Sequence, residues 1–84
     1  MHTLPPSSGF LFPLEGLRSG EWAEVAQVEG EPAWVARLAE LGLRAGSRLQ
    51  VLQPGSPCLL QVGASRLSLR ADQAARILVH LRTA

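Results

Sequence analysis

Three side chains in this sequence are of the types that bind soft metal ions or act as nucleophile and base in catalysis: His2, Cys58 and His80. No two of them have the short spacing of zinc ligands or of a His-Glu-x-x-His pair. His80 alternates with apolar neighbours, so we expect it to face outward from a strand without supporting ligands. We predict that no cofactor is required, with a weak or intermolecular contact to a divalent transition metal as the alternative.

Cys58 could in principle act with a histidine in covalent catalysis. It stands at the start of an apolar run, however, where a packed thiol is the usual outcome. The sequence also lacks a Gly-x-x-x-x-Gly-Lys phosphate loop and a Gly-x-Ser-x-Gly elbow. We therefore predict that the protein is not an enzyme.

Composition limits the class of protein. The 84 residues suffice for one domain with a small core, and 46% hydrophobic against 18% charged residues argues against disorder. A lone cysteine cannot form an internal disulfide, which makes the cytoplasm the expected compartment. No apolar run approaches the ~20 residues of a membrane helix, so we expect no membrane insertion.

The elements that position these residues begin after a proline-rich start. Residues 1–9 contain Pro5-Pro6 and predict a flexible tail, so the domain is expected over 10–84. Residues 10–17 suit a packed loop or short edge segment. A strand is predicted over 21–29, with a bulge because its two valines are three residues apart.

A short helix follows, with Pro32 in its first turn. Trp34, Leu38 and Leu41 recur at helical spacing and predict a face that covers the barrel, which makes core packing the expected role of Trp34. Gly42 fits the left-handed position after the helix, and the next residue, Leu43, should pack back on Leu38.

Later runs predict strands over 48–51, 58–62, 66–69 and 77–81, and one helical turn over 72–75. Gly46 suits the turn before the first of these strands, and Leu67 and Leu69 should face the core. The pattern indicates a mostly β protein: a small SH3-like barrel of about five strands, with one short helix between the first two and a helical turn before the last. An OB-type barrel is the structural alternative.

The order and spacing of these motifs resemble the ferrous-iron transport protein A (FeoA) family. That family shows a Leu-x-x-Leu-x-x-Gly entry, a helix ending in Leu-x-x-Leu-Gly-Leu-x-Pro-Gly, and a late Leu-x-Leu-Arg followed by an Ile-x-Val strand. The matching positions are Leu14, Leu17 and Gly20, then Leu38, Leu41, Gly42, Leu43 and Gly46, and finally Leu67, Leu69, Arg70, Ile77 and Val79. Ala45 departs from the pattern, which usually has proline there.

The resemblance implies a small cytosolic accessory protein of ferrous-iron uptake. Proteins of this family work with the membrane permease FeoB, which carries its own GTPase domain, and we expect this chain to bind and modulate that permease. Arg37, Glu40 and Arg44, beside an exposed edge of Leu41, are the predicted partner-binding residues. The plain alternative is a solvated helix face.

A small barrel that binds nucleic acid is the alternative function. The arginines are dispersed, tyrosine is absent and the net charge is +1, so we expect no nucleic-acid partner. Self-association stays open.

Overall fold

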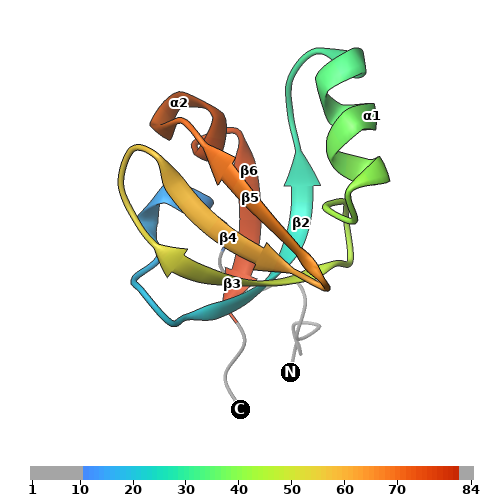
Figure 1. Cartoon of the computed structure of the whole chain (residues 1–84). Helices are drawn as coiled ribbons and strands as arrows, with labels where there is room; N and C mark the ends of the chain where they lie inside the picture. Colours follow the sequence, from blue (N-terminus) through green and yellow to red (C-terminus); the bar gives the residue numbers. More distant parts are fainter. Residues whose placement is uncertain (1–10, 82–84) are drawn as a thin grey trace, which may run out of the picture.

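Residues 11–81 of the computed structural model form a curved antiparallel sheet with two short α-helices (Figure 1). The predictions made for a tail over residues 1–9, and for His2 as a ligand, lie outside these described residues. The elements in chain order are β1 (Phe12–Pro13), a 3-10 helix η2 (Leu14–Gly16), β2 (Trp22–Val28), α1 (Pro32–Glu40), β3 (Arg48–Gln53), β4 (Cys58–Val62), β5 (Ser65–Leu69), α2 (Ala71–Ala74) and β6 (Ile77–Leu81).

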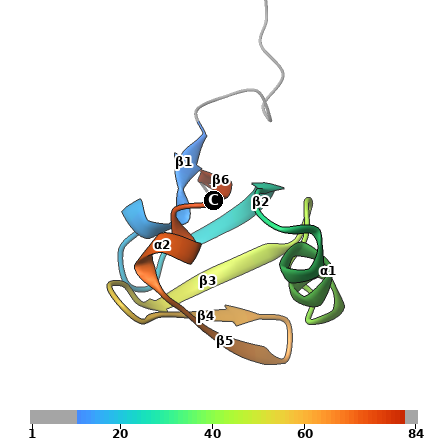
Figure 2. The same ribbon diagram turned by 90° about the horizontal axis from the view of Figure 1, so that it is seen from above.

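The strands lie in the order β1-β6-β2-β3-β4-β5 and curl around a common interior (Figure 2). The predicted mostly β class, the helix before β3 and the helical turn before the last strand are confirmed. The sheet has six strands, one more than expected, because Phe12 and Pro13 pair with Val79 and Leu78 of β6. β1 and β5 end the sheet and do not pair with each other.

The predicted bulge in β2 is confirmed. The register of β2 against β6 shifts between Val25 and Gln27. This shift lets Val25 point inward while Val28 packs partly buried against the core three residues later.

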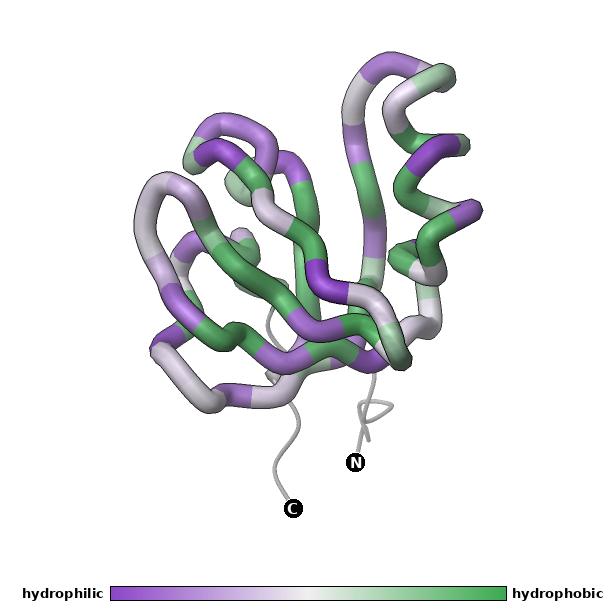
Figure 3. Tube along the Cα trace, viewed as in Figure 1, coloured by the Kyte–Doolittle hydropathy of each residue, from purple (hydrophilic) through white to green (hydrophobic). Residues whose placement is uncertain are grey.

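Alternation along the strands builds the core, and polar and apolar segments alternate along the strands in Figure 3. Leu49 and Val51 are fully buried, as predicted from their spacing. The buried residues are Leu14, Leu17, Ala23, Val25, Leu38, Leu43, Leu49, Val51, Cys58, Leu60, Val62, Leu69, Ala74, Ile77 and Val79.

Helix α1 begins at Pro32 and ends in a Schellman motif, as the sequence predicted. The Leu43 N–H donates to the Leu38 carbonyl at 2.8 Å, and the Gly42 N–H donates to the Ala39 carbonyl at 3.0 Å. Gly42 has φ +100°, in the left-handed region that favours glycine. The last carbonyls of the helix are therefore satisfied within the chain.

The predicted apolar face of α1 is correct only in part. Leu38 is buried and Trp34 packs partly buried against the core, but Leu41 is 43% exposed. The helix ends at Glu40, and the turn at Gly42 sends Leu43 into the core in place of Leu41. Leu67 and Leu69 face the core as predicted, with Leu69 buried and Leu67 packed partly buried against the core.

Candidate partner-binding site

A surface groove of about 750 Å³ lies where the start of β2, the end of α1 and the β4–β5 turn meet. We call it the Trp22 groove, and the following residues line it: Trp22, Glu40, Leu41, Gly42, Gly46, Ser47, Arg48, Gln61, Val62, Gly63, Ala64 and Ser65. Trp22 and Leu41 are two of the four large hydrophobic side chains exposed among residues 11–81. Tryptophan is enriched among the few residues that contribute most of the energy of a protein interface, and a neighbouring apolar side chain helps to exclude water around it.

Trp22 faces outward because β2 alternates. Ala23 and Val25 point into the core, which leaves Trp22 45% exposed on the opposite face of the sheet. The guanidinium carbon of Arg48, on the neighbouring strand β3, lies 5.5 Å from the centre of the Trp22 ring. This cation–π contact covers one part of the indole and puts a positive charge at the rim of the groove.

The loop after α1 forms a wall of the groove and is held by its own hydrogen bonds. The Ser47 hydroxyl donates to the Gly42 carbonyl at 2.6 Å and accepts from the Arg44 N–H at 3.2 Å. The Gly46 N–H donates to the Val25 carbonyl at 2.8 Å, and the Val25 N–H donates to the Ser47 carbonyl at 2.7 Å. Leu41 is therefore presented from a segment fixed at both ends.

The predicted partner-binding residues divide between two places. Glu40 and Leu41 line the Trp22 groove, whereas Arg37 and Arg44 are exposed but do not line it. Trp22 was not predicted as a partner-binding residue. Alternation along β2 explains why its side chain points outward, but its place in the groove depends on how β2, the end of α1 and the β4–β5 turn meet in space. Whether this surface binds a partner stays a prediction.

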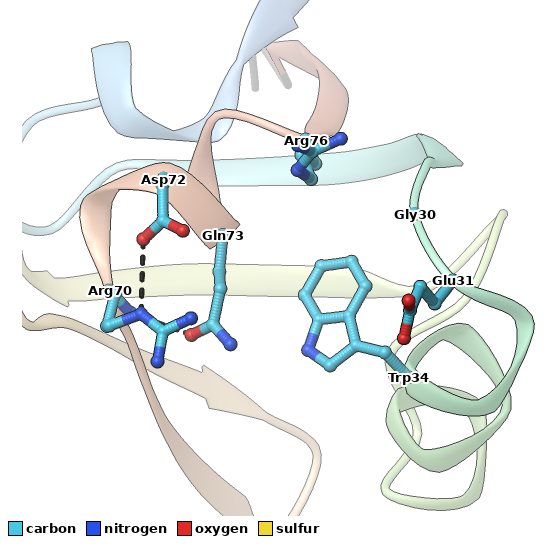
Figure 4. A pocket seen from close by; sticks show the side chains of 7 residues that line it. All are labelled: Gly30, Glu31, Trp34, Arg70, Asp72, Gln73 and Arg76. Carbon is cyan, nitrogen blue, oxygen red and sulfur yellow. Dashed lines mark hydrogen bonds and ion pairs between the residues drawn. The ribbon is translucent and has the colours of Figure 1, made fainter.

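A second hollow, of about 540 Å³, lies between the start of α1 and helix α2 (Figure 4). We call it the Trp34 pocket, and it is lined by Gly30, Glu31, Trp34, Arg70, Asp72, Gln73 and Arg76. Figure 4 shows the Trp34 indole extending from α1 toward Arg70 and Gln73. One part of the Trp34 side chain therefore packs against the core, as predicted, and another part lines the pocket.

Charged and small residues shape the Trp34 pocket. Arg70 Nε lies 3.2 Å from Asp72 Oδ1, and the hydrogen bond from Arg70 lowers the pKa of that carboxyl group. The Arg70 N–H donates to Gln73 Oε1 at 2.9 Å, which holds the start of α2. A Cβ atom on Gly30 would lie 2.8 Å from Cε3 of Trp34, so glycine at this position leaves room for the indole.

Two of the candidate metal ligands, Cys58 and His80, lie on strands that do not pair with each other. Cys58 is 1% exposed in the core, and its burial raises the pKa of the thiol. His80 lies on β6 with Glu24 of β2 as its cross-strand neighbour, and its Nδ1 atom is buried without a hydrogen-bond partner. Within residues 11–81, no three His, Cys, Asp or Glu side chains cluster closely enough to hold a metal ion.

Comparisons with known proteins extend this picture. The family model described as the FeoA domain matches residues 12–81. A comparison with curated protein sequences finds no match.

Among solved structures, the FeoA protein of Chlorobium tepidum is 37% identical, with a TM-score of 0.81 over 86% of this chain and 71% of that chain. The FeoA of Stenotrophomonas maltophilia, solved with zinc, is 34% identical, with a TM-score of 0.69 over 80% of this chain and 87% of that one. It is described as an SH3 domain protein and a candidate activating factor of ferrous iron transport.

A manganese-dependent transcriptional repressor shares the fold at 22% identity and a TM-score of 0.76, over 86% of this chain and 42% of that chain. The SH3-like architecture expected from the sequence is confirmed by these likenesses.

Proposed function

Because this chain belongs to the FeoA domain family, we propose that it is a small cytoplasmic accessory protein of ferrous-iron uptake that binds and modulates the permease FeoB. The family match covers nearly all of the described residues. None of the helices within residues 11–81 is long and apolar enough to cross a membrane. The proposed role is therefore binding to a membrane protein from outside the bilayer.

The observation that carries the binding role is the paired exposure of Trp22 and Leu41 in one groove. Both side chains lose contact with water when a partner covers them, and burial of apolar surface contributes roughly 25 cal/mol per Å². The groove also has a charge of each sign, from Glu40 and Arg48, which can fix the orientation of a partner. An apolar centre with a charged rim is typical of a protein-binding surface.

Modulation requires a difference in affinity. A protein that binds two states of its partner equally well does not change the equilibrium between those states. A tenfold preference for one state shifts that equilibrium by about 1.4 kcal/mol. We propose that the chain prefers one state of the permease, and that any GTP hydrolysis belongs to the partner. Cys58 is buried, so it is not available as a nucleophile to a substrate in solution.

Calorimetric titration of the protein into detergent-solubilised permease tests this proposal. The titration is repeated with guanine nucleotides, and with Fe²⁺ under anaerobic conditions. We expect saturable binding that Trp22→Ala and Leu41→Ala each weaken about tenfold or more. Leu11→Ala is the matched control, because Leu11 is 47% exposed and does not line the groove.

Different outcomes would show whether the proposed binding surface or the proposed partner is wrong. Binding that is weakened by Arg37→Ala and Arg44→Ala, but not by the groove variants, would move the interface to the exposed side of α1 and the loop that follows it. Absence of binding in every nucleotide and metal state would refute FeoB as the partner.

A further inference from the structure

β5 is an edge strand with one side unpaired. It pairs with β4 alone, from Cys58 opposite Leu69 to Val62 opposite Ser65. Among the described residues, no other backbone or side-chain group forms a hydrogen bond with the main chain of Ser65–Leu69. Figures 1 and 2 show β5 at the end of the curved sheet. Its outward N–H and C=O groups can pair with another extended chain.

The free edge of β5 runs between the two hollows described above. Ser65, at the start of β5, lines the Trp22 groove, and Arg70, just after its end, lines the Trp34 pocket. α1 borders the same two hollows, with Leu41 at the first and Trp34 at the second. β5 and α1 therefore each border both hollows. We call the region between these two elements the seam, and its partly buried apolar side chains are Leu67 of β5 and Trp34 of α1.

The charges on β5 specify what fits the edge. Arg66 and Ser68 are exposed on the outer face, whereas Leu67 and Leu69 point toward the interior. Arg70 continues the same alternation and is paired with the exposed Asp72, so Arg66 is the unneutralised charge of the edge. The strand carries no acidic residue. Opposite charges on neighbouring strands stabilise their pairing and like charges destabilise it. In an antiparallel pair of two β5 strands centred on Ser68, Arg66 of one copy would lie opposite Arg70 of the other, and no register offers an acidic residue of β5 to Arg66. The edge therefore favours an acidic segment over self-pairing.

We propose that the free edge of β5 binds an extended partner segment in which acidic and apolar residues alternate. The acidic side chains lie beside Arg66 and Arg70, and the apolar ones enter the seam toward Leu67 and Trp34. Main-chain hydrogen bonds to β5 provide much of the affinity, and the alternating side chains provide specificity. This surface and this partner chemistry do not depend on whether the partner is FeoB.

Titration of the ¹⁵N-labelled full chain with the peptide acetyl-(Glu-Val)₃-Glu-amide tests the proposal by NMR. We expect shifts concentrated in the amides of Ser65–Leu69, and slower hydrogen exchange, by about tenfold or more, at alternate amides of the strand. Arg66→Glu should weaken binding about tenfold, while Arg18→Glu, in a loop away from β5, should leave it unchanged within about twofold. Circular dichroism confirms that both variants fold.

Three altered peptides, one with lysine in place of glutamate and two with N-methyl groups, identify the mode of binding. A lysine-for-glutamate version should not bind. Two further versions carry N-methyl groups, one at the odd-numbered and one at the even-numbered residues of the peptide. Each keeps all side chains but lacks the N–H donors along one of its two edges, so at least one version should bind about tenfold more weakly.

If both methylated forms bind as tightly as the unmodified peptide, the side chains alone account for binding, and the proposed strand pairing is overturned. Shifts that map elsewhere, or no shift at millimolar peptide, would overturn the site. Shifts in the β5 amides on raising the protein concentration without peptide would show self-pairing and overturn the acidic partner.

Discussion

Alkaline pH should destabilise this protein through one side chain, Cys58. The thiol is 1% exposed in β4, opposite Leu69 of β5, and burial raises its pKa. The folded state therefore keeps the thiol proton at pH values where the unfolded chain has already lost it. The stabilisation is fully present below the unfolded pKa of about 8.5, and it is lost as the pH rises toward the folded pKa.

The composition of the chain makes this effect measurable. The eight basic residues are all arginine and there is no tyrosine, so Cys58 is the side chain that titrates between about pH 8 and pH 11. The free energy of unfolding should fall with a slope of at most about 1.4 kcal/mol per pH unit. With an unfolded pKa near 8.5, the loss reaches up to about 2 kcal/mol at pH 10.

Urea unfolding followed by tryptophan fluorescence, from pH 7.5 to 10.5 with a reducing agent, measures this loss. Cys58→Ala should lower the stability by about 1–2 kcal/mol at pH 7.5, because it leaves a small cavity, and should remove the dependence on alkaline pH. An alanine variant that loses stability above pH 9 as steeply as the parent protein would refute the assignment to this thiol.

Two glycine positions give further predictions. Gly30→Ala brings a Cβ atom to 2.8 Å from Trp34 at φ +144°, so it should destabilise the protein by about 1–3 kcal/mol and alter the tryptophan fluorescence. Gly16→Ala, which meets no atom within 4 Å, is the control and should stay within about 0.5 kcal/mol. Gly42→Ala places a side chain at φ +100° and should lower the unfolding free energy by about 1–2 kcal/mol in the same urea assay. An unchanged urea midpoint would contradict the requirement for glycine at the end of α1.

Features determined by neighbouring residues could be predicted from the sequence. The helix ending at Leu38–Leu43 depends on a glycine and on apolar residues within one turn, and the bulge in β2 follows from the spacing of two valines. β1 was predicted only as one of two alternatives, a packed loop or a short edge segment, because its two residues pair with β6, far away in the sequence.

The candidate site was predicted only in part for the same reason. Glu40 and Leu41 follow from the helix, but Trp22 joins them only because β2, the loop before β3 and the β4–β5 turn converge in space. No periodicity within β2 indicates which outward residue faces a hollow. A single sequence does not show which distant segments come together in the folded chain.

The position of β6 between β1 and β2 also dictates when the fold can be completed during protein synthesis. The strands from β2 to β5 are neighbours in both sequence and space, so they can assemble before β6 is available. β1 leaves the ribosome first, yet its pairing partner is made last. Until residues 77–81 emerge, β1 therefore stays unpaired and β2 keeps an open edge, in addition to the edge of β5, and open strand edges of this kind favour aggregation.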